Sequence, residues 1–111
     1  WIVLCIPDWR PDPERNAVSI RTIGKKVFPI FGRIVKVIWK GQDNGTGLVA
    51  KLSRDEAIEQ MCINIGNLEI RSCSKEFSGW TLQVDRPFTP TMKDWESIQL
   101  LARHLLSSSP N

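Results

Sequence analysis

The chain has little of the material from which a catalytic centre or a metal site is usually built. It contains one histidine, His104, and three cysteines, none of them at CxxC spacing, among 111 residues. One histidine provides no histidine cluster for a metal and few options for a nucleophile and its base. Three cysteines cannot all pair, which argues against a disulfide framework and predicts an intracellular reducing compartment. The sequence therefore predicts no catalytic residue, no cofactor and no metal.

Long hydrophobic runs are also missing. The longest, Trp1 to Ile6, falls far short of the ~20 residues that cross a bilayer, and no signal-peptide pattern is present. The apolar content of 41% and the charged content of 24% are typical of a globular domain, and the length suits one core. Because the chain begins at Trp1 and not at a methionine, we expect a domain of a longer protein.

Acidic residues are absent between Arg15 and Lys40, a stretch with seven basic residues. The sequence Asp12-Pro13-Glu14 is a helix-start signal, and apolar residues recur behind it at helical spacing as far as Phe28, just before Pro29. These features predict a basic amphipathic helix that begins at Pro13. Its exposed face would carry Arg15, Arg21, Lys25, Lys26 and Arg33.

This basic face is the first candidate interaction site. Clustered lysine and arginine attract an acidic protein, an anionic membrane surface or nucleic acid, and the alternative is an ordinary solvated face. Nucleic acid is the least favoured partner because no nucleic-acid-binding motif accompanies the charge. The second candidate site is the proline-rich residues 1–12, an extended arm, short strand or linker whose Trp1 and Trp9 would dock on this domain or on a neighbour.

The rest of the chain alternates between strand and helix patterns. Alternating residues in 33–40 and 48–53, joined by the turn GQDNGTG, predict a hairpin, and a second hairpin is predicted for 68–73 with 80–85. A Ser53/Glu56 capping box predicts a helix that ends at Gly66, and a Thr91/Asp94 capping box predicts the last helix.

The predicted fold class is therefore α+β, an antiparallel sheet with covering helices in the order α-β-β-α-β-β-α. Residues 13–107 would form the single domain, and 108–111 a tail. By periodicity Trp39, Trp80 and Trp95 should lie in the core, with Trp95 anchoring the last helix against the sheet.

The cysteines and His104 have ordinary structural interpretations. Cys73, on the polar face of its strand, is the candidate reactive thiol; Arg71 favours its thiolate, whereas Glu69 and Glu76 oppose it. Cys62 is predicted to be core, and His104 a solvated surface residue.

The run GWTLQVDRPFTPTMKDWESIQLLARHLL, Gly79 to Leu106, resembles the closing strand and helix of GAF domains. The Asn-Lys-Phe-Asp-Glu signature of that family is absent. The matching positions are Gly79, Leu82, Arg86, Pro87, Phe88, Thr89, Asp94, Ile98, Leu101 and Ala102. More faintly, the short GAF-like chain resembles the plastid and cyanobacterial membrane factors that assist haem attachment to the photosynthetic cytochrome complex. That resemblance implies a place in the chloroplast stroma facing the thylakoid membrane.

Three functions are compatible with these patterns. The first is a non-catalytic GAF-like protein-interaction module of a larger, membrane-tethered protein, acting in assembly or scaffolding, with other protein subunits as partners. The second is a small-molecule-sensing GAF domain. The third is a thiol-based redox enzyme that uses Cys73.

Overall fold

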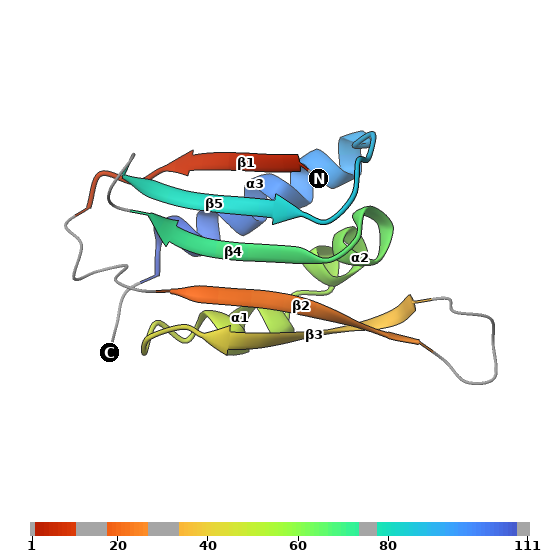
Figure 1. Ribbon diagram of the computed structural model, residues 1–111, viewed down its shortest axis with the longest axis horizontal. Coiled ribbons are helices and arrows are strands. Elements are labelled where there is room, and N and C mark those ends of the chain that lie inside the picture. Colours follow the sequence, from red (N-terminus) through yellow and green to blue (C-terminus); the bar gives the residue numbers. More distant parts are fainter. Residues whose placement is uncertain (1, 11–17, 27–33, 74–77, 109–111) are drawn as a thin grey trace.

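The computed structural model describes residues 2–10, 18–26, 34–73 and 78–108, with the side chains of 25, 26, 34, 35 and 73 left out. These residues form five strands and three helices (Figure 1). In chain order they are β1 (Ile2–Pro7), β2 (Ser19–Lys26), β3 (Ile34–Gln42), α1 (Leu48–Ser53), α2 (Glu56–Ile65), β4 (Leu68–Cys73), β5 (Gly79–Val84) and α3 (Met92–Leu106).

The strands form one antiparallel sheet in the order β1-β5-β4-β2-β3. All three helices lie behind the sheet in Figure 1, so in the described part of the chain no helix covers the front face. Strands alternate their side chains between the two faces. The inward residues, among them Ile70 on β4 and Trp80 on β5, are fully buried against the helices, while their neighbours face the open side.

Two helices begin with side-chain caps. In α3 the Thr91 hydroxyl accepts a hydrogen bond from the Asp94 amide, and the Asp94 carboxylate accepts one from the Thr91 amide, so the predicted capping box is confirmed. In α2 the cap is Asp55, whose carboxylate accepts hydrogen bonds from the amides of Ala57 and Ile58, and not the predicted Ser53. The hairpin of β4 and β5 is confirmed as well.

The α+β class is confirmed, but the predicted order of elements is wrong. Ser19–Lys26 form the strand β2 and not part of a helix. Ile20 and Thr22 are buried while Ser19 and Arg21 are exposed, a period of two that the apolar residues at helical spacing had concealed. The predicted helix start at Pro13 lies outside the described residues.

The predicted strand 48–53 is also wrong, because Leu48–Ser53 form the helix α1. Its two buried residues, Leu48 and Leu52, are four positions apart, which fits a helix turn as well as strand alternation. The true partner of β3 is β2, with Gly41 opposite Ile20. Gly41 has a φ of 128°, and a Cβ there would stand 2.3 Å from the Ser19 carbonyl oxygen, so only glycine permits this approach.

The placement of Trp95 in the core is wrong, whereas Trp39 and Trp80 are buried as predicted. Trp95 is 44% exposed, and the buried side of α3 is centred instead on Leu101, which is fully buried. The buried set of that helix also contains Asp94, Ser97, Ile98 and Leu105. The predicted stripe was therefore displaced around the helix toward the side that Trp95 occupies.

Residues predicted as an arm or short strand include an edge strand of the sheet. Ile2–Pro7 pair with β5 along their full length, from Ile2 opposite Val84 to Pro7 opposite Gly79. Leu4 and Ile6 pack partly buried against the core.

Candidate interaction surface on the open sheet face

The basic face was predicted on a helix, but three of its five residues lie on the strand β2. Arg21 is exposed on β2, and Lys25 and Lys26 belong to the same strand, with an irregularity of the register between them. The five residues therefore do not share a helical face. Arg15 and Arg33 lie outside the described residues.

Residues of β3 enter the surface instead. Arg21 stands directly opposite Lys40, Lys25 is opposite Lys36, and an Ile23–Ile38 pair lies between them in the same antiparallel register. Lys36 and Lys40 are exposed, and the two isoleucines are half-buried. Sequence reasoning placed both lysines in the basic stretch, but only the register assigns them to the same surface as Arg21.

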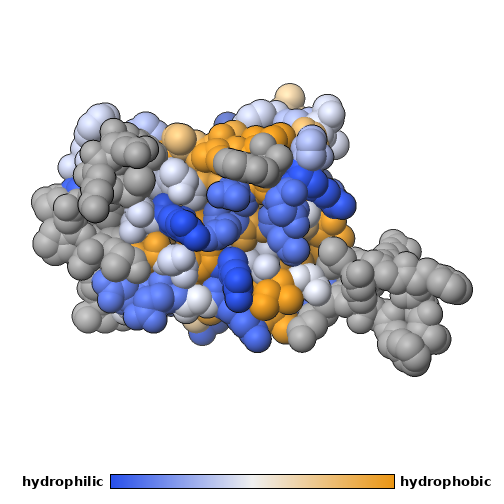
Figure 2. All heavy atoms as spheres, in the orientation of Figure 1, coloured by the Kyte–Doolittle hydropathy of each residue, from blue (hydrophilic) through white to orange (hydrophobic). Residues whose placement is uncertain are grey.

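One carboxylate adjoins this row from β4. Glu69 is opposite Arg21 on the other side of β2, and its Oε1 lies 2.5 Å from the Nη2 of Arg71. The carboxylate thus lies among three cations, because Lys40 follows in the next strand. A depression of about 300 Å³ lies over these residues and extends to Ser19 and Gly41. Figure 2 shows hydrophilic side chains across the centre of this face.

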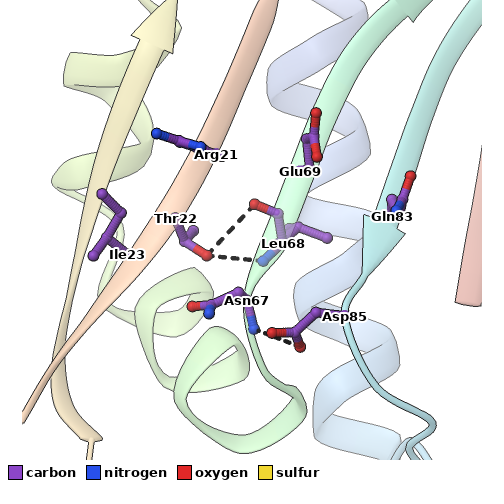
Figure 3. A pocket seen from close by; sticks show the side chains of 8 residues that line it. All are labelled: Arg21, Thr22, Ile23, Asn67, Leu68, Glu69, Gln83 and Asp85. Atoms are coloured by element: carbon purple, nitrogen blue, oxygen red, sulfur yellow. Dashed lines mark hydrogen bonds between the residues drawn. The ribbon is translucent and has the colours of Figure 1, made fainter. Parts of the chain in front are cut away.

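A second depression opens where β2 leaves β4. The two strands pair only from Ser19 to Arg21, and beyond that point the Thr22 hydroxyl bridges the gap (Figure 3). It accepts a hydrogen bond of 2.8 Å from the Leu68 amide and lies 3.5 Å from the Leu68 carbonyl oxygen as donor. The buried hydroxyl thereby replaces the missing ladder bond.

This second depression has a volume of about 400 Å³ and is lined by both polar and apolar side chains. At its lower end in Figure 3 the Asp85 carboxylate accepts a hydrogen bond of 3.2 Å from the Asn67 amide. Arg21, Glu69 and Gln83 surround its upper part. The volume and the polar groups suit a small polar molecule.

Trp9 is held on the surface by its two neighbours. Its side chain is 85% exposed, whereas Asp8 is only 3% exposed. The Asp8 carboxylate accepts hydrogen bonds from the Arg10 guanidinium and from the Trp80 indole, the latter at 3.0 Å. Arg10 also donates to the carbonyl oxygens of Leu105 and Ser108 at the end of α3. Trp9 is therefore an exposed residue whose two neighbours in the chain are held by hydrogen bonds. Trp1 lies outside the described residues.

Hydrogen bonding determines the charge state of Asp8. Burial by itself raises the pKa of this carboxyl group, but the hydrogen bonds from Arg10 and Trp80 outweigh it and lower the pKa from 3.8 to about 2. Asp8 is thus ionised at neutral pH and pairs with Arg10 at 2.7 Å. No pattern in the sequence pointed to this cluster, because its members come from both ends of the chain.

The remaining candidate groups are two cysteines and the histidine. Cys62 is in the core as predicted, where burial and then the charge of Glu59 raise the pKa of its thiol to about 12. The Cys73 side chain is outside the described set. His104 is half-buried and not fully solvated, with Nε2 3.1 Å from an Asp55 oxygen.

Neither a metal cluster nor a membrane-spanning helix is found among the described residues, and no match to a known protein assigns a function. Among the described residues, no cluster of three or more histidine, cysteine, aspartate or glutamate side chains is arranged to hold a metal ion. No described helix has the length and apolar character needed to span a membrane. No family model matches the chain, and no curated protein or solved structure matches it either.

Proposed function

We infer that the chain is a non-catalytic GAF-like protein-interaction module of a larger, membrane-tethered protein. It acts in the assembly or scaffolding of a complex, and the resemblance of its closing strand and helix suggests cytochrome cofactor assembly as the setting. The observation that carries the interaction role is a pair of like charges on the open sheet face, Arg21 directly opposite Lys40, with the exposed Lys36 further along β3.

Like charges directly opposite each other destabilise an antiparallel pair, whereas opposite charges stabilise it. Folding alone thus gives no reason for the pair of Arg21 and Lys40, or for a third exposed cation, Lys36, on the same strand as Lys40. Glu69 offsets only part of the positive charge, because it already pairs with Arg71. The surface therefore suits an acidic segment of a protein partner, whose carboxylates would relieve the repulsion around Arg21 and Lys40.

Binding of a fluorescent glutamate- and aspartate-rich peptide, measured by anisotropy, tests this role. The variant Arg21→Glu/Lys40→Glu should bind about tenfold or more weakly at low salt, since each charge near the surface contributes on the order of 1 kcal/mol. Raising the salt should weaken wild-type binding, because the Debye length shrinks. The control is Lys51→Glu, which reverses an exposed charge on α1, behind the sheet, and should leave binding nearly unchanged.

The same variants separate this role from two alternatives. Lys40→Glu alone should leave stability unchanged or raise it by up to about 1 kcal/mol, because it gives Arg21 an opposite charge across the strands. Equal loss of binding in Arg21→Glu/Lys40→Glu and Lys51→Glu would mean that net charge and not this face binds the peptide. Binding to anionic vesicles but not to the peptide would assign the face to a membrane surface.

A second candidate function is small-molecule sensing, favoured by the depression of about 400 Å³ between β2 and β4. A metabolite bound there would raise the melting temperature in proportion to the logarithm of its concentration. Gln83→Leu removes a polar lining group and should abolish that shift while leaving peptide binding intact.

A further inference from the structure

Helix α3 carries two stripes of side chains, of which only one is used by the fold. The first stripe, which includes Ile98 and Leu101, is buried against the core. The second stripe follows alternating steps of three and four residues and is exposed except at the half-buried Ala102; it contains Met92, Trp95, Gln99, Ala102 and Leu106. Met92 is 77% exposed, Trp95 44% and Leu106 42%, and these are three of the five large apolar side chains exposed in the described chain.

Single apolar residues at a surface need no explanation, but a row at this spacing has a known use. Steps of three and four bring side chains into one line along a helix that packs against a second helix. The opposite side of α3 is already occupied, because His104 contacts Asp55 at the start of α2. His104 is nine residues from Trp95, which is half a turn around the helix, so the exposed stripe faces away from α2.

We propose that this exposed stripe is a self-association surface, on which α3 of a second copy of the chain packs antiparallel. The stripe is nearly symmetric about Leu100, with Trp95 five residues before it and Leu106 six residues after. A two-fold axis at that point places Trp95 of each copy against Leu106 of the other. Ala102 and Gln99 lie near the axis, where the small alanine side chain lets the helices approach closely.

The charges beside the stripe select the same arrangement. Glu96 and Arg103 are both exposed, and within the described residues neither has an ion-pair partner. The antiparallel two-fold brings Glu96 of one copy beside Arg103 of the other, and does so twice. In a parallel pair the flank that carries Glu96 and Arg103 would lie on opposite edges of the contact in the two copies, and these two charges would not meet. The surface is therefore complementary to itself in charge.

The size of the contact sets the expected strength. A helix of 15 residues is about 22 Å long, and one helix pair buries on the order of 1,000 Å² in total, at the low end for specific interfaces. We therefore expect a reversible dimer whose population rises with protein concentration.

Sedimentation velocity of the 111-residue chain over a series of protein concentrations tests the proposal. The wild type should shift from monomer to dimer, and Leu106→Glu should stay monomeric. Glu96→Arg and Arg103→Glu should each dissociate at about tenfold higher concentration, because each turns two attractive contacts into repulsive ones. The double variant Glu96→Arg/Arg103→Glu should regain the wild-type dimer, and so should a mixture of the two single variants.

The matched control is Lys93→Glu, which reverses an exposed charge on the side of α3 away from the stripe and should dimerise like the wild type. Circular dichroism melting of every variant separates lost association from lost folding. A wild type that remains monomeric throughout the series would overturn the proposal, as would a charge swap that fails to restore the dimer.

Discussion

At the scale of single residues, Asp8 shows how one buried charge can connect distant parts of the chain. Its carboxylate bonds to Arg10 and to the Trp80 indole, and Arg10 reaches the end of α3 through Leu105 and Ser108. Removing one partner of a buried charge pair leaves the other charge without compensation. Asp8, together with Arg10, therefore connects the end of β1 both to the sheet and to the end of α3.

We predict that Asp8→Asn lowers the free energy of unfolding by about 2 to 3 kcal/mol at pH 7. Because the pKa is lowered from 3.8 in the unfolded chain to about 2 in the folded protein, the stabilisation is complete above the unfolded pKa and is lost as the pH falls from about 4 to about 2. Urea unfolding of both proteins at pH 7, 4, 3 and 2 would measure it. A difference between the two proteins that stays constant over this range would assign the loss to packing alone.

At the scale of elements, the sequence predicted the structure correctly where a segment had a helix cap or where its residues fitted only one of the two periods, that of a helix or that of a strand. The Thr91/Asp94 cap located α3, and alternation along 68–73 and 80–85 located the β4–β5 hairpin. Ile20 and Ile23, three positions apart, share one side of a helix but lie on opposite faces of the strand, and the contacts with β3 and β4 decide for the strand. A window of six residues, as in Leu48–Ser53, is too short to separate the two periods.

The candidate interaction surface was predictable only in its charge. A run without acids identified Arg21 as part of a basic surface, but the two neighbours that matter in space, Lys40 and Glu69, are 19 and 48 positions away in the chain. Strand register brings them together, and register depends on the whole sheet. The same dependence hid the Asp8 cluster.

Helix α3 allows a direct comparison of its two stripes. Leu101→Ala should lower the free energy of unfolding by about 2 to 5 kcal/mol, since it empties a fully buried site. Trp95→Ala should cost about 1 kcal/mol or less when the protein is dilute and monomeric, because the ring is 44% exposed. Chemical denaturation monitored by circular dichroism would measure both. A cost for Trp95→Ala as large as that for Leu101→Ala would show that the ring supports the core.

At the scale of the whole molecule, the two proposed contact surfaces belong to opposite sides of the sheet. The pair of Arg21 and Lys40 is on the open face at β2 and β3, whereas α3, which carries the exposed stripe, lies behind the sheet (Figure 1). The core lies between them, with Trp80 and Ile70 fully buried. Contacts that share no residue and are well separated usually contribute additively.

We therefore predict that the two associations are independent. Leu106→Glu should abolish dimerisation yet bind a single acidic peptide with wild-type affinity, and Arg21→Glu/Lys40→Glu should dimerise normally while losing the peptide. A probe with two linked peptides distinguishes the states further, because a dimer can engage both copies at once and gains apparent affinity through the high effective concentration of the second site. That gain should vanish in Leu106→Glu. Weaker binding of the single peptide by Leu106→Glu would instead reveal coupling through the sheet, since neither surface touches the other directly.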